Sequence, residues 1–422
     1  MSFASRPWAG RTHVELAELA RELLLCGHLI DRSGMPQAIA RLDRDGMAEV
    51  AIGEWMGASP IYTKRMQRLL GFEGETVETA FKGMQLDIGA PPEFLDFRYT
   101  VSDDKNGSFC LAHCGALMDV EPMGEDYVHT MCHTIEDPTF DATAVASNPR
   151  AQVRPVHRPP REPADREPHC EWTVTIDDNA DPVPMPAQAV AMSRSNAAQL
   201  DLSDGDPSLD SSDGWNNYSE PLDPDLVMER FSSQALSRIC DEVALQGQML
   251  SRSFFTEITE RVEPDEVLPI ATKQAIGIAG LASKRLAAAL QADRSIAGLA
   301  KVLAVHPMFL PRSYVDFDIA ENDSFLRVAI RPCPGTAEVD GLSWPALLTG
   351  PTGTEIVRSA VICHLRTALV SPSPTTGDEL VSWTLHDDPS GAPQAQAEEV
   401  TLAEFSTGAK FAFERRTIAP VP

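Results

Sequence analysis

Apolar residues recur at helical spacing near the start of each half of the chain. The segment 14–26 places them on one face behind Thr12, a favoured N-cap residue, and the segment 231–250 has a similar stripe. Further helices are expected over 59–70, whose first two residues are a serine cap and a proline, and over 265–290. The stripes consist of Leu16, Leu19 and Leu23 in the first half and of Leu236, Ile239, Val243 and Met249 in the second.

Alternating apolar and polar residues follow these helices and predict β-strands. In the first half they run over 97–114, interrupted by a turn at Asn106-Gly107, and in the second half they run over 315–333. Strands with this alternation bury one face of a sheet. Each set of helices is therefore expected to pack on a small antiparallel sheet.

The same order of features recurs in the two halves, which predicts a tandem duplication. In each half a strand-like stretch ends at a cysteine, a helical stretch then carries a Cys-His pair, and a closing strand contains a tryptophan. The matching features are Cys114 with Cys333, the pair at 132–133 with the pair at 363–364, and Trp172 with Trp383.

An acidic stretch separates the two halves. Residues 201–229 hold nine acidic side chains and no Lys or Arg, a composition typical of a disordered linker. We expect an α+β fold of two related domains, each a helical bundle packed on a small antiparallel sheet, arranged as an intramolecular pseudo-dimer. The expected parts are a first domain over 1–190, an acidic disordered linker over 191–228, a second domain over 229–400 and a C-terminal tail over 401–422.

Charge and composition narrow the choice of partners. The 422 residues include 35 Lys and Arg against 62 Asp and Glu, a net charge of −27 that repels phosphate backbones and anionic lipid. Nucleic acid is not an expected partner, although 47–71 resembles a helix-turn-helix with Lys64, Arg65 and Arg68 on its second helix. No apolar run approaches the roughly 20 residues that a membrane helix needs, so no membrane partner is expected. Eight cysteines and a charged beginning favour a cytoplasmic protein with reduced thiols.

Histidines and carboxylates gather in one stretch of the first half. His129 and His133 are four residues apart, so on a helix they share one face. Asp126 lies about a turn earlier with Glu125 beside it, and Glu136 and Asp137 lie about a turn later. Imidazole and carboxylate groups are usual ligands of Zn²⁺ and Mn²⁺. One hypothesis for this segment is therefore a divalent metal site whose open position activates water; otherwise no cofactor is expected.

The neighbouring cysteines support two other hypotheses. A thiolate nucleophile paired with a histidine would use Cys110 or Cys132 with His113 or His133. On a strand, Cys110 and Cys114 would share one face while His113 points to the other. Under the third hypothesis, the cysteines are small buried hydrophobes and the histidines form local hydrogen bonds.

Arginines stand out in the segment 148–161 of an otherwise acidic chain. Arg150 and Arg154 would hold a substrate carboxylate, because guanidinium groups bind carboxylates through two hydrogen bonds. The alternative is a solvated arm that is ion-paired to the acidic surface. Nucleotide hydrolysis has no support, since the glycines at 350–353 lack the Gly-Lys ending of a phosphate-binding loop.

Several stretches of the first half form a recognisable series. They are the strands up to Cys114, the helix around Cys132, the runs Asn-Pro-Arg-Ala-Gln-Val-Arg at 148–154 and His-Arg-Pro-Pro at 157–160, and the Cys-Glu-Trp strand at 170–172. Together they resemble the L-2-amino-thiazoline-4-carboxylic acid hydrolase family over 14–178, with a fainter likeness over 231–388. The resemblance implies metal-assisted hydrolysis of a cyclic C–N bond in a small heterocycle.

We therefore expect a hydrolase that acts on a non-peptide C–N bond of a small heterocyclic or amide substrate. Its first copy would be active and its second copy degenerate. His129 and His133 would bind a metal or serve as a base, Cys110 or Cys132 would be a ligand or a nucleophile, and Arg154 would hold a substrate carboxylate. The alternative is a non-catalytic binding or accessory protein with structural cysteines.

Overall fold

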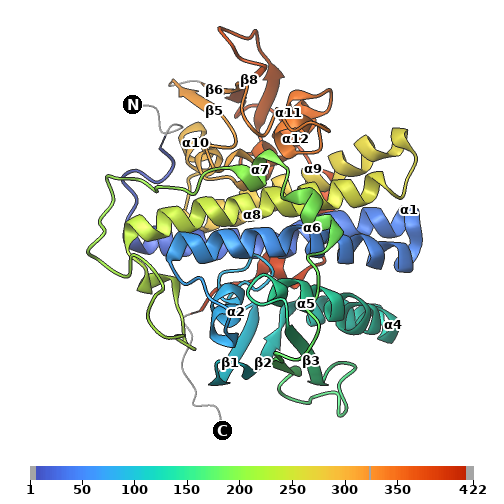
Figure 1. The fold of residues 1–422 in the computed structure, drawn as a ribbon. Coiled ribbons are helices and arrows are strands. Elements are labelled where there is room, and N and C mark those ends of the chain that lie inside the picture. Colours follow the sequence, from blue (N-terminus) through green and yellow to red (C-terminus); the bar gives the residue numbers. More distant parts are fainter. Residues whose placement is uncertain (1–5, 323–324, 415–422) are drawn as a thin grey trace.

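Helices from both halves form one layer through the middle of the molecule, and a four-stranded sheet lies on either side of this layer (Figure 1). The structure is a computed structural model that describes residues 6–322 and 325–414. Helices and antiparallel sheets occur in both halves, so the predicted α+β fold with a helical part and a small sheet in each domain is confirmed.

The helix layer consists of α1 (His13–Leu70), α8 (Ser233–Thr259) and α9 (Pro264–Ala289). A capping box at Thr12 begins α1, as the sequence predicts. All seven apolar residues of the two predicted stripes are buried in this layer. The stripes of the two halves therefore pack into a shared interior and not into two separate bundles.

The second arm of α1 begins earlier than predicted. The chain breaks its helical conformation at Asp43 (φ 65°, ψ −171°), whose carboxylate caps the next turn by accepting from the backbone N–H of Gly46 at 3.1 Å. Ser59 and Pro60, expected to begin a helix, lie buried inside this arm. Residues 47–71 are thus one arm and not a helix-turn-helix, and the predicted recognition residue Arg65 is buried.

The first sheet has the strand order β1-β2-β4-β3, and each neighbouring pair is antiparallel. The turn between its first two strands lies at 104–105 and not at Asn106-Gly107. Asp103 pairs with Asn106 across the turn, and its carboxylate accepts from the backbone N–H of Lys105 at 2.8 Å. The strands are β1 (Leu95–Asp103), β2 (Asn106–Cys114), β3 (Ala151–His157) and β4 (Cys170–Ile176).

The second sheet has the equivalent order, β5-β6-β8-β7. The two predicted tryptophans occupy matching places in the two sheets: Trp172 lies opposite Pro155, and Trp383 lies opposite Pro372. The order of the elements is therefore the same in both halves at the level of strand pairing. The strands are β5 (Phe317–Glu321), β6 (Phe325–Ile330), β7 (Ala368–Pro372) and β8 (Val381–Asp387).

Shorter helices cover the sheets and connect them to the layer. Those of the first half are α2 (Val77–Met84), α3 (Gly115–Val120), η2 (Glu121–Met123), α4 (Glu125–His129), the π-helical turn η3 (Thr130–Ile135), α5 (Glu136–Val145) and α6 (Ala187–Met192). The remainder are α7 (Asn196–Gln199), η4 (Met228–Arg230), α10 (Ile296–Ala304), η5 (Pro307–Phe309), α11 (Trp344–Thr349), α12 (Gly353–His364), α13 (Glu398–Ala403) and η6 (Thr407–Lys410).

The acidic segment 191–228 packs on the helix layer and does not extend away from it as a disordered linker would. Tyr218 is fully buried, its backbone N–H donates to the carbonyl of Leu70 at 2.8 Å, and its hydroxyl donates to Gln85 at 2.8 Å. The aromatic ring supplies burial that the acidic composition alone does not predict. The expected tail likewise begins inside α13 and continues as an ordered segment to residue 414; 415–422 lie outside the described residues.

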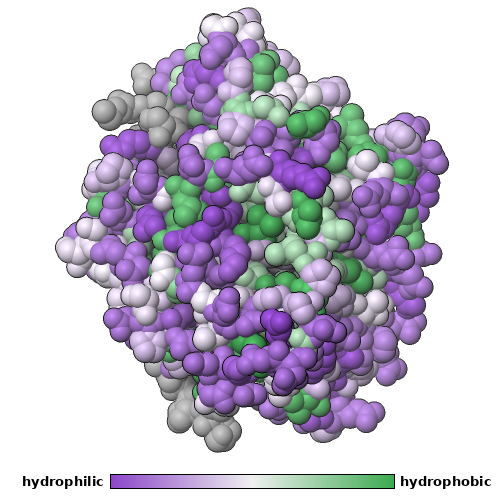
Figure 2. All heavy atoms as spheres, viewed as in Figure 1, coloured by the Kyte–Doolittle hydropathy of each residue, from purple (hydrophilic) through white to green (hydrophobic). Residues whose placement is uncertain are grey.

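Two apolar cores support the fold. One runs through the helix layer and the second sheet and joins residues of both halves, and the other lies between the first sheet and its helices. Hydrophilic side chains cover most of the face in Figure 2, as the strongly acidic composition requires. Among the described residues, no helix has both the length and the apolar character needed to cross a membrane.

Candidate functional site

The four predicted metal ligands do not point toward one centre. His129 and His133 share a helical face as predicted, but their rings stack at 4.1 Å with an interplanar angle of 11°. The Nε2 of His133 donates to the carbonyl of Pro159 at 2.7 Å, and burial lowers the pKa of this histidine. Asp126 forms an ion pair with Arg44 at 2.9 Å.

The fourth predicted ligand, Glu125, is exposed near the start of α4. No three or more His, Cys, Asp or Glu side chains are grouped to hold a metal ion within residues 6–322 and 325–414. The structure brings the two histidines together and leaves both carboxylates apart from them.

The predicted cysteines are not paired with the predicted histidines. Cys132 lies buried in the π-helical turn, where burial raises the pKa of its thiol far above the ordinary value. Cys110 is only partly buried, and burial also raises its pKa. His113 is half-buried with its ring 5.7 Å from that of His169. In the described part of the chain, no hydrogen bond joins a thiol to a histidine side chain, so none of these thiols has an activating base.

Cys110 and Cys114 do not share a face of β2. Phe97 pairs with Leu111 while Leu95 pairs with Cys114, so β2 gains one residue over β1 at this bulge. The bulge turns Cys114 into the buried interior, where its Sγ accepts from the backbone N–H of Leu117 at 3.3 Å. Burial raises the pKa of Cys114 to about 12, which keeps the thiol protonated. All eight cysteines are free.

The two predicted substrate-binding arginines hold β3 in place. Arg154 donates to both carboxylate oxygens of Asp141, at 2.9 and 2.8 Å. Arg150 donates from Nε to the carbonyl of Ala180 at 3.0 Å. Their hydrogen bonds agree with the alternative of an ion-paired arm.

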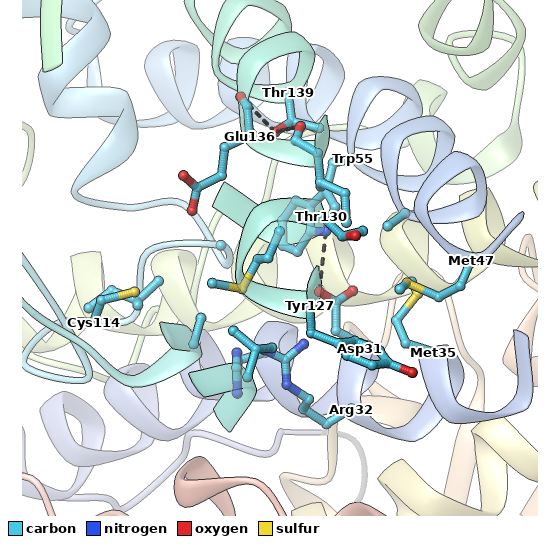
Figure 3. Close-up of a pocket in the computed structure, with 18 of the residues that line it drawn as sticks. Asp31, Arg32, Met35, Met47, Trp55, Cys114, Tyr127, Thr130, Glu136 and Thr139 are labelled. Carbon is cyan, nitrogen blue, oxygen red and sulfur yellow. Dashed lines mark hydrogen bonds between the residues drawn. The ribbon is translucent and has the colours of Figure 1, made fainter. Parts of the chain in front are cut away.

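A cavity of about 780 Å³ lies in the first half, between α1, the beginning of the first sheet and the π-helical turn (Figure 3). Its wall is mostly apolar, and its size suits a small organic molecule. Thr130, Met131 and Ile135 of the π-helical turn contribute to it, which is typical of the functional sites where such turns occur. Other lining residues are Met35, Met47, Trp55, Met84, Phe97, Met123 and Tyr127, and the second half adds Leu402 and Phe405.

Asp31 and Glu54 form a buried carboxyl pair at this cavity. Asp31 lines the wall, where its Oδ2 accepts from the indole N–H of Trp55 at 3.4 Å (Figure 3). The Oδ1 of Asp31 and both carboxyl oxygens of the fully buried Glu54 accept no hydrogen bond from a donor among the described residues. Burial raises the pKa of Asp31 to about 6. Burial and the charge of Asp31 raise the pKa of Glu54 well above its usual value.

Two further carboxyl groups line the same cavity. Glu136 follows the π-helical turn, burial raises its pKa to about 8, and its Oε2 is buried without a donor among the described residues. In Figure 3 the carboxyl group of Glu136 lies at the upper left, and Asp31 lies below it and to the right. Asp87 accepts from the Tyr62 hydroxyl at 2.8 Å and from the Gly89 N–H at 2.7 Å, and burial raises its pKa to about 6.

Arg32 supplies the positive charge of the cavity wall. Its Nε donates to Asp119 at 3.0 Å, and His28 bonds the same carboxylate oxygen at 2.8 Å. Although burial opposes ionisation, the hydrogen bond from His28 and the charges of His28 and Arg32 hold the pKa of Asp119 well below its ordinary value. Asp119 therefore fixes the direction of Arg32.

Most residues of the cavity were missed in the sequence, although an internal signal marks Asp31 and its neighbour Glu54. The run LCGHLIDRSGM at 25–35 matches LQGQMLSRSFF at 245–255, which aligns Asp31 with Ser251. The run AIGEW at 51–55 matches AIGIA at 275–279, which aligns Glu54 with Ile278. Both carboxyl groups are thus confined to the first half.

Comparison of the chain with protein-family models, with curated proteins and with solved structures finds no match. The resemblance to the L-2-amino-thiazoline-4-carboxylic acid hydrolase family stays a prediction from the residues.

Proposed function

We propose that the first half binds an apolar, nitrogen-containing small molecule in its cavity and hydrolyses a C–N bond of it. The observation that carries the proposal is a pair of carboxyl groups, Asp31 and Glu136, on an apolar wall. Each has a buried oxygen without a donor among the described residues, and their pKa values differ in the range around neutrality. An unpartnered carboxylate in apolar surroundings attracts an amine or another hydrogen-bond donor, because its own desolvation is otherwise uncompensated.

Asp31 is the base and Glu136 the acid in this proposal. Between their pKa values of about 6 and about 8, Asp31 is ionised and Glu136 is protonated. The oxygen of a water molecule bonds to the substrate carbon as Asp31 accepts its proton. The C–N bond then breaks as the departing nitrogen takes the proton of Glu136. Glu54 does not line the cavity, so it acts as a positioning residue beside Asp31.

We infer that the two halves arose by duplication and that the second has lost this chemistry. The equal strand orders and the matching Trp-Pro pairs support a common origin. Ser251 and Ile278 in place of the carboxyl pair support the loss. Metal assistance through His129 and His133 is a separate proposal, tested by elemental analysis of the purified protein beside His129→Ala.

A binding protein without turnover is the second candidate. Five methionines line the cavity, and flexible thioether side chains suit the binding of varied apolar ligands. They are Met35, Met47, Met84, Met123 and Met131.

Turnover of cyclic amides and cyclic amidines, followed by mass spectrometry of the ring-opened product, separates these functions. The native chain should open a member of this class, and Asp31→Asn and Glu136→Gln should each lower the rate about 100-fold or more. Glu73→Gln, which changes an exposed carboxylate of the same half, should leave the rate unchanged. Tight binding of apolar amines without turnover of any compound would favour the binding protein.

A further inference from the structure

The second half reaches across the helix layer to the cavity of the first half (Figure 1, red). After α13, Ser406 donates from its hydroxyl to Asp119 at 2.7 Å, and the backbone N–H of Thr407 donates to the other oxygen of Asp119 at 2.7 Å. Just before these residues, Leu402 and Phe405 line the cavity. We call residues 398–411 the C-terminal arm.

The first half reaches into the second half in the same way. Residues 187–200, which we call the central arm, run through α6 and α7. The backbone N–H groups of Asn196 and Ala197 donate to the carboxylate of Glu338 at 3.2 and 3.0 Å. Each arm thus binds a carboxylate of the opposite half through the first N–H groups of a short helical turn.

The two arms correspond in sequence position. Ser406 follows Ser195 by 211 residues (406 − 195), the same interval that separates Trp383 from Trp172 (383 − 172). Both serines cap the turn that they precede, by accepting from Gly408 and Ala198 respectively. The arms are therefore exchanged reciprocally, as in a pair of subunits that swap their ends.

The carboxylates that receive the arms also correspond in their partners. Asp119 holds Arg32 at 3.0 Å, and Glu338 lies 3.7 Å from Arg252, the residue that aligns with Arg32. Arg32 lines the cavity of about 780 Å³, whereas Arg252 is not among its lining residues. The contact of the C-terminal arm with Asp119 is therefore a contact with the wall of the candidate site.

The arms differ where the C-terminal arm meets the cavity. Leu402 and Phe405 align with Ala191 and Arg194 of the central arm (402 − 191 = 211 and 405 − 194 = 211). The two apolar side chains are 48% and 44% exposed, although large apolar groups gain free energy when they leave water. A ligand in the cavity would cover them. Large apolar residues occur in the arm that meets the cavity and not at the matching places of the other arm.

We propose that the second half completes the binding site of the first. Its C-terminal arm supplies Leu402 and Phe405, which contact the ligand and limit its size. Asp119 binds both this arm and Arg32, and so positions Arg32 beside the arm. The retained second half thereby acts as a partner within the same chain. This inference rests on the cavity being the ligand site of the proposed function, and it does not depend on hydrolysis.

Fluorescence titration with N-phenyl-1-naphthylamine, a probe that brightens in apolar surroundings, tests this role in the full chain. Phe405→Ala and Leu402→Ala should each raise the dissociation constant of the probe about tenfold, since each removes an apolar contact. Arg194→Ala, at the place in the central arm that matches Phe405, should leave it unchanged. Circular dichroism checks that each variant is folded, which the partial exposure of Phe405 and Leu402 favours.

A second pair of variants tests the positioning role of Asp119. Asp119→Asn should loosen the C-terminal arm, seen as faster amide hydrogen exchange over 398–411, and weaken probe binding. Glu338→Gln should loosen only the central arm and leave probe binding unchanged. Unaltered probe binding in Phe405→Ala, Leu402→Ala and Asp119→Asn would overturn the inference while the cavity stands. No probe binding by the native chain would overturn the cavity and this inference together.

Discussion

At the scale of single residues, the candidate chemistry depends on carboxyl groups that burial keeps near their point of titration. Asp31 and Glu136 line one apolar cavity, yet their pKa values of about 6 and about 8 differ enough to give them opposite protonation states at neutral pH. Of the histidines and cysteines named from the sequence, His133 forms a local hydrogen bond, Cys132 is buried and His129 stacks on His133. The proposed acid and base are therefore found by burial and not by residue type.

The rate of hydrolysis should follow a bell-shaped pH profile with its maximum near pH 7. Below about pH 6 Asp31 becomes protonated and stops acting as a base, and above about pH 8 Glu136 loses the proton that it donates. The measurement is the pH dependence of kcat/KM. A profile set by an ionised thiol would instead rise with pH toward the raised pKa of Cys114, about 12, and would contradict this assignment.

Glu54→Ile should stabilise the protein by about 1–3 kcal/mol, because it removes a buried carboxyl group that lacks a donor and restores the residue of the second half. Since the folded state raises the pKa of Glu54, native stability falls as pH rises above the unfolded value. The gain should accordingly be larger at pH 8 than at pH 5 in denaturant unfolding. Glu49→Ala, at an exposed position of the same helix α1, should change stability little.

At the scale of helices and strands, periodicity predicted which elements form better than it predicted where they begin and end. The stripe from Leu16 to Leu23 and the strands that carry the two tryptophans were predicted because each buries one face. The turn at 104–105 and the break at Asp43 were missed, since side-chain hydrogen bonds to the backbone decide both. The bulge before Cys114 reversed a predicted face, because an alternating pattern does not reveal an inserted residue.

The cavity could not be predicted from the sequence either. Its wall combines α1, β1, the π-helical turn and the C-terminal arm, which lie far apart along the chain. The absence of Asp31 and Glu54 from the matching runs of the second half is one signal that the sequence could have provided.

The ion pair that joins α1 to α8 should matter strongly for stability. Arg65 and Glu242 are both buried and lie 2.7 Å apart, so Glu242→Ala would leave a buried guanidinium without its carboxylate and cost about 3–5 kcal/mol. Arg41→Ala, which breaks the exposed pair with Glu266 between α1 and α9, should have little effect. Equal losses in urea unfolding would contradict the importance of burial.

At the scale of the whole molecule, the two halves depend on each other. One core runs through helices of both halves, and each half binds the arm of the other through a buried carboxylate. The expected pseudo-dimer stays a prediction. Its boundaries at 190 and 229 stay predictions, because the segment between them packs on the helix layer.

The chain should unfold in one cooperative step despite its length. Since the shared core belongs to both halves, neither half can open without exposing apolar surface of the other. Differential scanning calorimetry should give a single transition whose calorimetric and van't Hoff enthalpies agree. Two separate transitions would contradict the shared core.

The most direct test of the central claim is a competition measurement at pH 7 with N-phenyl-1-naphthylamine bound to the native chain. Phenylpropylamine and phenylpropanol have nearly the same shape, but only the amine is a cation. The carboxyl-lined cavity predicts displacement by the amine at about tenfold lower concentration than by the alcohol, and equal displacement in Asp31→Asn. Equal displacement by the two compounds from the native chain would contradict the claim that Asp31 makes this cavity a site for nitrogen-containing ligands.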